Sequence, residues 1–154
     1  MEIRPAVRGD ARSMSLLLNE LVAAAKRRSA ADEGSVLNNY IEDPELILCS
    51  LAVDGTTILG FQSLKRASAG NRYGTPVGWG IIGTHVSPLA SRRGVGSRLF
   101  EVTRDAGRNA GIEHIEAFIG AANVEGQAYY EKMGFRTYRI AEGAVCKRCR
   151  LTGP

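Results

Sequence analysis

Apolar residues recur at two different spacings along the chain, and the change of spacing separates predicted helices from predicted strands. Met14, Leu17, Leu18, Leu21, Val22 and Ala25 recur at spacings of three and four, which predicts a helix with one apolar face that begins near Asp10. Shorter runs of apolar or alternating residues, bounded by Gly, Pro or Asp-Gly, predict strands. These strands are expected at residues 2–7, 46–53, 56–66, 77–86, 112–119, 134–140 and 144–151.

A second helical pattern follows the fourth predicted strand. Val95, Leu99, Val102 and Ala106 repeat at helical spacing and predict a helix that ends at residues 109–111. Weaker helical patterns are expected at residues 35–43 and 123–133. Together these elements predict an α/β (α+β) fold, with a mixed, largely antiparallel sheet of six to seven strands flanked by about four helices.

Two local signals refine this predicted sheet. Asp54-Gly55 lies between two strand patterns, and this dipeptide suits the tight turn of an antiparallel hairpin. Gly80 and Gly83 interrupt the strand pattern at residues 77–86, where glycine often marks a bulge or a close approach of another backbone. We therefore expect a hairpin followed by an irregular strand.

Length and composition indicate one domain. At 154 residues, 44% hydrophobic and 23% charged, the chain can bury one substantial core, and no linker or repeat divides residues 1–154. No apolar run approaches the roughly 18 residues that span a membrane, and the N-terminus lacks the apolar segment of a signal peptide. We therefore expect a single cytoplasmic domain that does not contact a membrane.

The formal net charge is +4, and most of the basic residues are arginine. This charge suits an anionic ligand, although it is also ordinary for a small domain. Aromatic residues make up only 6% of the chain, whereas a nucleic-acid surface is expected to interleave aromatic and basic side chains. We therefore predict no nucleic-acid partner.

Three cysteines are too few for a disulfide framework. Cys146 and Cys149 form a C-x-x-C, which could be half of a zinc site or a redox pair. No second pair accompanies them, and a separation of three along a strand places the two side chains on opposite faces. Structural thiols are therefore expected, and no metal site is predicted.

Residues 91–98, SRRGVGSR, separate a predicted strand from a predicted helix. The first N–H groups of a helix have no partner within it and lie at its positive dipole end. Gly94 and Gly96 would let an anion such as a pyrophosphate approach these groups, and the three arginines add positive charge. A plain turn with solvent-exposed arginines is the alternative. A Rossmann motif is disfavoured because Leu99 stands where its third glycine would be.

A second motif decides between these alternatives. Residues 123–135, NVEGQAYYEKMGF, together with residues 85–96, HVSPLASRRGVG, resemble the GCN5-related N-acetyltransferase family. In that family the motif R/Q-x-x-G-x-G/A holds the pyrophosphate of acetyl-coenzyme A, and Gly94 and Gly96 occupy its two small positions. The later pattern of the family is matched by Asn123, Tyr130, Gly134 and Phe135.

The resemblance implies acetyl-coenzyme A as co-substrate, with its pantetheine arm between the strands at 77–86 and 112–119. A bulge in the first of these strands would free backbone groups to bind this arm. Ser91 stands where the family usually has Gln or Arg, so one phosphate contact is weaker or comes from Arg92 or Arg93. The residues that the resemblance assigns to the co-substrate are His85, Val86, Ser91, Arg92, Arg93, Gly94, Val95, Gly96, Ser97, Asn123 and Tyr130.

The resemblance places Tyr130 in the role of general acid. A phenol has a reference pKa of about 10, so it stays protonated near neutral pH and can donate a proton to the departing sulfur. Packing is the alternative, and it is the expected role of the neighbouring Tyr129. Some relatives carry a basic glutamate five residues before the motif asparagine, where this chain has Phe118. Glu116, His85 and water are therefore the candidate bases. The alternative for the two side chains is a surface glutamate and a histidine satisfied by a neighbour.

The sequence predicts an acetyl-CoA-dependent N-acetyltransferase, an acyltransferase acting on the primary amine of a small or amino-acid-like acceptor. Residues 26–40 are long enough to form an acceptor wall, with Asp32, Glu33 and Tyr40 available to hold a cation. The short connection between the last two strands leaves the opposite side open. A protein or peptide acetyltransferase and a coenzyme A binding module without catalysis are the alternatives. Exposed strand edges are compatible with a homodimer.

Overall fold

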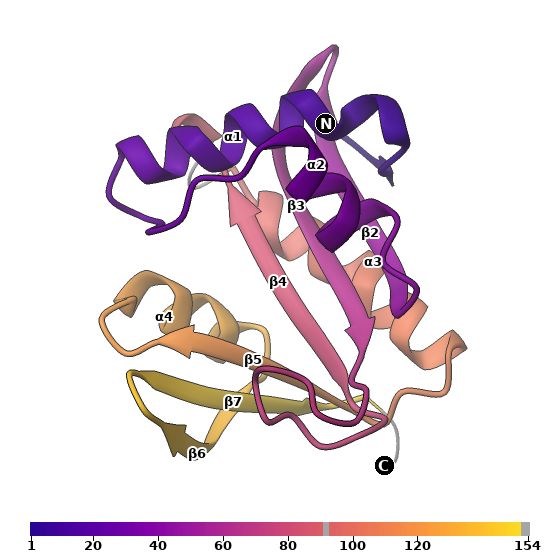
Figure 1. Cartoon of the computed structure of the whole chain (residues 1–154), viewed down its shortest axis with the longest axis vertical. Helices are drawn as coiled ribbons and strands as arrows, with labels where there is room; N and C mark the ends of the chain where they lie inside the picture. Colours follow the sequence, from indigo (N-terminus) through magenta and orange to yellow (C-terminus); the bar gives the residue numbers. More distant parts are fainter. Residues whose placement is uncertain (91–92, 152–154) are drawn as a thin grey trace.

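One mixed sheet of seven strands runs through the computed structural model, which describes residues 1–90 and 93–151 (Figure 1). The strands are β1 (Glu2–Pro5), β2 (Leu46–Asp54), β3 (Thr57–Arg66), β4 (Gly80–Val86), β5 (His114–Gly120), β6 (Arg136–Ala141) and β7 (Ala144–Arg150). Their order in the sheet is β1-β2-β3-β4-β5-β7-β6. Neighbours are antiparallel except β4 and β5, which are parallel. The predicted mixed, largely antiparallel sheet is confirmed.

Four α-helices flank the sheet: α1 (Ala11–Ala23), α2 (Glu33–Val36), α3 (Val95–Asn109) and α4 (Val124–Lys132). Short 3-10 turns lie at Arg8–Asp10 and Pro88–Ala90, and a π-helical turn lies at Leu37–Ile41. The single helix expected at 35–43 is therefore divided between α2 and this π-helical turn. None of the described helices is long and apolar enough to cross a membrane.

Helices cover both faces of the sheet, and neighbouring residues of β2 show which helix covers which face. Leu51 belongs to the apolar cluster of α1, whose buried residues include Met14 and Leu18. Ala52 points the other way and packs in a cluster with Leu99 of α3. The α1 face predicted from sequence is therefore confirmed from Met14 to Leu21, whereas Val22 is only partly buried and Ala25 is exposed beyond the end of the helix. The sheet lies between α1 on one side and α3 on the other.

The parallel contact between β4 and β5 is short. It covers three residue pairs, from Gly80 opposite Ile115 to Ile82 opposite Ala117. Beyond these pairs the two strands diverge, and Figure 1 shows them leaving a common point at a wide angle. The second half of β4 therefore has β3 as its partner on one side and, among the described residues, no strand on the other.

The expected bulge in β4 is wrong. The ladder between β3 and β4 runs without a shift of register from Gly60 opposite Val86 to Arg66 opposite Gly80. Gly80 is required for packing instead, because a Cβ added there would lie 2.8 Å from Cδ1 of Leu64. The strand also begins at Gly80 rather than at residue 77, so residues 67–79 form one long loop between β3 and β4.

The buried face of α3 differs from the predicted one. Its described buried residues are Val95, Leu99, Phe100, Thr103 and Gly107, whereas Val102 and Ala106 are only partly buried. A Cβ at Gly107 would lie 2.7 Å from Cδ1 of Leu151 and 3.3 Å from Cδ2 of Leu64, so the side chains of the core pack directly against the helix backbone at this glycine. An apolar-residue pattern does not detect a contact face that is centred on Thr and Gly.

Candidate active site

A cleft of about 1510 Å³ opens where β4 and β5 part. β4 lines it with residues 83–86, β5 lines it with residues 118–120, and α3 and α4 contribute their nearest turns. Of the residues predicted to bind acetyl-coenzyme A, those that line this cleft are His85, Val86, Gly94, Val95, Gly96, Ser97, Asn123 and Tyr130. Two sequence motifs far apart in the chain thus meet around one cavity.

The predicted basic residues before α3 are placed differently. Ser91 and Arg92 lie outside the described residues. Arg93 is exposed, and its guanidinium lies 3.3 Å from the carboxylate of Asp54 at the end of β2. At the α3 end, the described wall of the cleft therefore consists of backbone and small side chains, with Arg93 directed toward a surface carboxylate.

Gly94 and Gly96 are needed for different physical reasons. Gly94 is the N-cap of α3 and has φ +73°, a left-handed backbone conformation that residues other than glycine rarely adopt. A Cβ added to Gly94 would meet no atom within 4 Å, so the space in front of it is open. A Cβ added to Gly96 would lie 2.5 Å from Cε1 of Tyr129. The first group that a side chain at position 96 meets is therefore a tyrosine ring of the protein itself.

Tyr130 extends from α4 toward β4 and is almost fully buried. Its hydroxyl lies 2.7 Å from Oγ1 of Thr84, and its ring packs edge-on against Phe135. Burial raises the pKa of Tyr130, an effect that the hydrogen bond to Thr84 only partly offsets. The phenol is therefore protonated throughout the range in which an enzyme works.

Asn123 begins α4 as its N-cap. Its side-chain oxygen accepts a hydrogen bond from the backbone N–H of Gly126 at 2.9 Å, which satisfies one of the free amides of the first turn. The predicted capping role is confirmed. Because Asn123 also lines the cleft, the cap fixes the position from which α4 presents Tyr130.

Two residues that the sequence did not single out, Gln62 and Thr84, connect Tyr129 to this wall. The Tyr129 hydroxyl donates to the carbonyl of Gly96 at 2.8 Å and accepts from Nε2 of Gln62 at 2.9 Å. Nε2 of Gln62 also donates to Oγ1 of Thr84 at 2.9 Å. The expectation that Tyr129 only packs away from the site is wrong. A Gln in the apolar run of β3 was the available signal, because a buried amide needs partners.

The sequence matches the model of the acetyltransferase (GNAT) family over residues 14–135. The chain belongs to the acetyltransferase (GNAT) family. It is therefore an acetyl-CoA-dependent acetyltransferase. The divergence of β4 and β5 described above belongs to its GNAT fold.

Solved structures of other GNAT proteins share this fold at low sequence identity. A putative acetyltransferase from Salmonella typhimurium, yncA, solved with acetyl-CoA, has a TM-score of 0.77 at 19% identity, covering 98% of this chain and 94% of its own. A putative phosphinothricin N-acetyltransferase has a TM-score of 0.78 at 17% identity, covering 99% of this chain and 99% of its own. The ribosomal-protein-S18-alanine N-acetyltransferase of Escherichia coli has a TM-score of 0.75 at 16% identity, covering 99% of this chain and 95% of its own. No curated protein matches the sequence.

Of the two side chains considered as bases in this GNAT protein, His85 lies in the cleft. Its ring centroid lies 4.7 Å from that of Phe61 and 5.6 Å from that of Tyr40. Burial, together with the nearby positive charge of Arg27, lowers the pKa of His85 to about 3. The imidazole is therefore neutral but only weakly basic, so it takes up a proton poorly at neutral pH.

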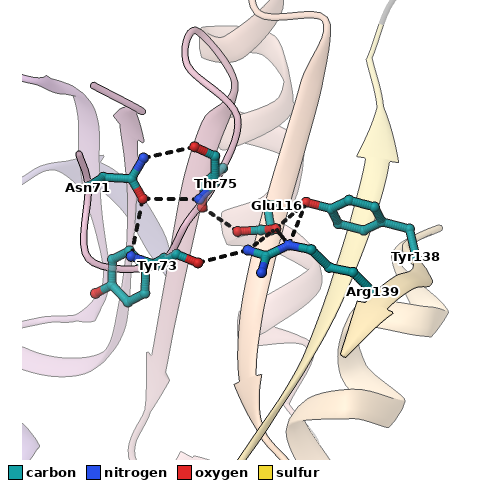
Figure 2. A network of polar contacts seen from close by, with 6 residues as sticks. All are labelled: Asn71, Tyr73, Thr75, Glu116, Tyr138 and Arg139. Carbon is teal, nitrogen blue, oxygen red and sulfur yellow. Dashed lines mark hydrogen bonds and ion pairs between the residues drawn. The ribbon is translucent and has the colours of Figure 1, made fainter. Parts of the chain in front are cut away.

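Glu116, the other candidate base, is fully buried outside the cleft. Figure 2 shows its carboxylate between the β3–β4 loop and β6, where it accepts hydrogen bonds from the hydroxyls of Thr75 and Tyr138. The guanidinium of Arg139 donates to the same carboxylate at 2.9 Å. Both carboxylate oxygens are thus engaged, and the geometry assigns Glu116 a structural role rather than that of a base.

The Glu116 network fixes the β3–β4 loop, residues 67–79, over β5 and β6. Arg139 also donates to the carbonyl of Tyr73 at 2.8 Å (Figure 2). The Tyr73 ring packs against that of Phe118, with their centroids 5.2 Å apart. Loop residues that line the cleft are Ser68, Asn71, Arg72 and Tyr73. The expectation that the short β6–β7 connection leaves this side open is therefore wrong, because the β3–β4 loop closes it.

The opposite wall, after α1, is also not the one expected. Asp32 is the N-cap of α2, where its carboxylate accepts from the backbone N–H of Ser35 at 2.8 Å. Asp32 and Glu33 line a separate shallow depression and not the main cleft, whereas Tyr40 does line the cleft. Helix capping, which the sequence Asp-Glu-Gly-Ser also fits, accounts for Asp32.

The C-x-x-C of β7 has the geometry predicted for it. Cys146 lies opposite Phe118 and Cys149 opposite Ile115, so the two thiols are on opposite faces of the sheet. Within residues 1–90 and 93–151, no three His, Cys, Asp or Glu side chains are grouped as metal ligands would be. Burial raises the pKa of both thiols, which lowers their reactivity as nucleophiles.

Proposed function

We propose that this GNAT protein transfers the acetyl group of acetyl-coenzyme A to the primary amine of a small acceptor that also carries a carboxylate. The observation that carries this proposal is the meeting of three features in one cleft. These are the open first turn of α3, the free edge of β4 beyond Ile82, and the hydroxyl of Tyr130. A neighbouring fold, yncA, was solved with acetyl-CoA, which agrees with this assignment.

The co-substrate side of the cleft fits its proposed ligand in charge and shape. Residues 94–97 form the first turn of α3, where unpaired N–H groups and the positive end of the helix dipole favour a pyrophosphate. Open space in front of Gly94 admits it. The free edge of β4 supplies backbone groups for the amides of the pantetheine arm, so the ligand occupies the place of a missing strand.

The reaction requires the amine nitrogen to attack the thioester carbon, forming the C–N bond and then breaking the C–S bond. The electron pair of the broken bond goes to sulfur. We assign Tyr130 as the catalytic residue whose O–H donates to this sulfur as negative charge develops. Because burial keeps its pKa high, the phenol acts chiefly as a hydrogen-bond donor. The amine nitrogen loses one proton and the departing sulfur gains one, so the protons balance when the free thiol is released.

The amine loses its proton to water in this proposal. Glu116 is engaged in its network, and His85 is too weakly basic. Arg27 lies on the same wall as His85, and its positive charge lowers the pKa of an ammonium group placed beside it. A larger fraction of the bound amine is then neutral and able to attack.

Basic side chains predominate on the acceptor side of the cleft. Lys65 is paired with Asp43 at 2.9 Å, whereas Arg27 and Arg72 take part in no ion pair among the described residues. Arg72 lies over the ring of Tyr73, with its guanidinium carbon 4.8 Å from the ring centre. An acceptor carboxylate would complete this arrangement, which supports an amino-acid-like acceptor over a simple amine.

Release of free thiol from acetyl-coenzyme A, measured with a panel of acceptors, tests the proposal. The panel contains amino acids, the corresponding amines without a carboxylate, and short peptides. We expect the highest kcat/KM with amino acids. Activity with peptides alone would replace the small acceptor with a protein acceptor. Binding of acetyl-coenzyme A without turnover on any amine would leave a coenzyme A binding module.

A further inference from the structure

A buried chain of hydrogen bonds leads from the first turn of α3 to the hydroxyl of Tyr130. It runs from the Gly96 carbonyl to Tyr129, then to Gln62, to Thr84 and to Tyr130, with donor–acceptor distances of 2.8, 2.9, 2.9 and 2.7 Å. Gln62 is fully buried at the centre of this chain. The five groups come from α3, α4, β3 and β4, so no short sequence motif contains them.

The Gly96 carbonyl fixes the direction of the first hydrogen bonds. A carbonyl oxygen can only accept, so the single hydrogen of the Tyr129 hydroxyl points to Gly96. The oxygen of Tyr129 must then accept from Gln62, which requires the NH2 of the amide, not its oxygen, to face the two hydroxyls. The Gln62 oxygen, turned away, has no hydrogen-bond partner among the described residues.

The direction of the remaining bonds follows from counting hydrogens. The second N–H of Gln62 donates to Oγ1 of Thr84. Thr84 also interacts with the Tyr129 hydroxyl, but the oxygen of Tyr129 already accepts from Gln62. The hydrogen of the Thr84 hydroxyl is therefore best placed toward Tyr130, the closest contact in the chain. The oxygen of Tyr130 accepts this hydrogen. The hydrogen of Tyr130 is therefore not used within the chain, and it can point into the cleft.

We propose that Gln62 and Thr84 are positioning residues that orient the hydroxyl of Tyr130 as a donor toward the sulfur of coenzyme A. This inference rests on the function proposed for Tyr130. Without the chain, the Tyr130 hydrogen could equally point back to Thr84. Donation by Thr84 also makes the Tyr130 oxygen a better carrier of developing negative charge, because successive hydrogen bonds polarise one another.

The acidity of bound coenzyme A tests the inference without any acceptor. A donor aimed at sulfur stabilises the thiolate, so the full-length protein should lower the pKa of bound coenzyme A thiol, followed by the ultraviolet absorbance of the thiolate. Thr84→Val should make the bound thiol roughly three- to tenfold less acidic than in the wild-type complex, the effect of one lost hydrogen bond. Thr84→Ser should restore most of the acidity.

A structural role for Thr84 would give different results in two controls. Thr103→Val removes another buried hydroxyl, and it should leave the thiol acidity unchanged. In a Tyr130→Phe background, Thr84→Val should have no further effect, since it acts only through Tyr130. Additive effects of the two changes, or unchanged acidity in folded Thr84→Val, would overturn the inference.

Gln62→Glu reverses the direction of the chain with nearly the same side-chain shape. An ionised carboxylate accepts from Thr84, which then accepts from Tyr130, so the Tyr130 hydrogen is drawn away from the cleft. We expect the pKa of the bound thiol in Gln62→Glu to be as high as in Thr84→Val, or higher. Wild-type acidity in folded Gln62→Glu above the pKa of the carboxylate would contradict the proposed direction. Failure of the wild-type protein to bind coenzyme A would instead overturn the proposed function, and this inference with it.

Discussion

The ring of Tyr129 occupies the space directly over the α-carbon of Gly96. A Cβ at position 96 would lie 2.5 Å from Cε1 and 3.1 Å from Cζ of that ring. The first distance is shorter than real Cβ contacts and the second is tighter than most of them. Tyr129 cannot easily move because its hydroxyl is held by Gly96 and Gln62. Position 96 is thus determined by contact with α4 before any ligand binds.

Gly96→Ala should therefore destabilise the fold itself. We expect a loss of roughly 1–3 kcal/mol in the free energy of unfolding, the usual cost of overpacking, measured by urea denaturation. Gly94→Ala is the matched control: it meets no atom but has a positive φ, so it should cost about 1 kcal/mol through backbone strain alone. Equal stability of Gly96→Ala and the wild type would contradict the contact with Tyr129.

A test of the pyrophosphate site is cleaner at Ser97 than at Gly96, where Glu would also collide with Tyr129. Ser97 lies in the first turn of α3 and lines the cleft. A glutamate in the first turn of a helix is stabilising, but in the cleft it repels a phosphate. We expect Ser97→Glu to weaken coenzyme A binding by roughly ten- to a hundredfold without loss of stability. Calorimetry measures the affinity, and thermal melting measures the stability. Ser97→Gln should bind nearly as the wild type does, and equal affinities for both variants would exclude the site.

Tyr130→Phe should lower kcat by roughly ten- to a thousandfold, because the sulfur then departs without a hydrogen-bond donor. Affinity for coenzyme A should change little, since the ring and its packing against Phe135 remain. Steady-state kinetics on the best acceptor of the panel, with calorimetry of cofactor binding, separates the two effects. An unchanged kcat would leave Tyr130 a packing residue.

Arg72→Ala should raise the KM of an amino-acid acceptor by about tenfold, the effect of one lost charge-assisted hydrogen bond at a solvent-exposed site. The KM of the same amine without its carboxylate should hardly change. Asp32→Ala and Glu33→Ala serve as controls, because both residues line a different depression, and neither should alter acceptor KM. If Arg72→Ala affects both acceptors equally, the guanidinium does not recognise a carboxylate.

The fold should be less stable in mild acid than at neutral pH because of His85. Its pKa is about 3 in the folded protein and about 6.5 in an unfolded chain, so only the unfolded chain takes up a proton between these values. Its contribution to stability is therefore complete above about pH 6.5 and is lost as pH falls toward 3. At about pH 5 the loss is about 2 kcal/mol. Urea denaturation at about pH 7 and 5 measures it, and His85→Phe should remove this part of the difference.

Local patterns in the sequence were sufficient for most elements but not for the contacts between them. The apolar repeat of α1 from Met14 to Leu21, the hairpin of β2 and β3 and the capping Asn123 depend on neighbouring residues and were predicted correctly. The turn of this hairpin is nevertheless Gly55-Thr56 rather than Asp54-Gly55, because Asp54 still pairs with Thr57. The role of Gln62 depends on residues 22, 34 and 67 positions away in the chain, Thr84, Gly96 and Tyr129. No periodicity or short motif encodes such a contact, because it exists only once the sheet and α4 are assembled.

Glu116 illustrates the same limit at the candidate site. Strand alternation correctly places it on the same face of β5 as Phe118, yet this face is covered beside Phe118 by Tyr73 and over Glu116 by Thr75 and Arg139. Whether a carboxylate on that face is a base or a buried anchor depends on the course of residues 67–79. A polar loop without periodicity gives no indication of that course. The sequence therefore suggested a base or a surface glutamate, and not the buried glutamate that the structure shows.

A strand with free backbone groups is a template on which another chain can add, and such edges promote aggregation. The inner edge of β4 has this character, but it lies within a cleft walled by α4 and by residues 26–31. A thin, unbranched molecule suits this edge, because it carries no side chains that need room on either face. The outer edges are short or irregular: β1 ends at Pro5, and β6 shifts register between Thr137 and Arg139. The fold thus presents one pairing edge inside a cleft, where a slender ligand can use it.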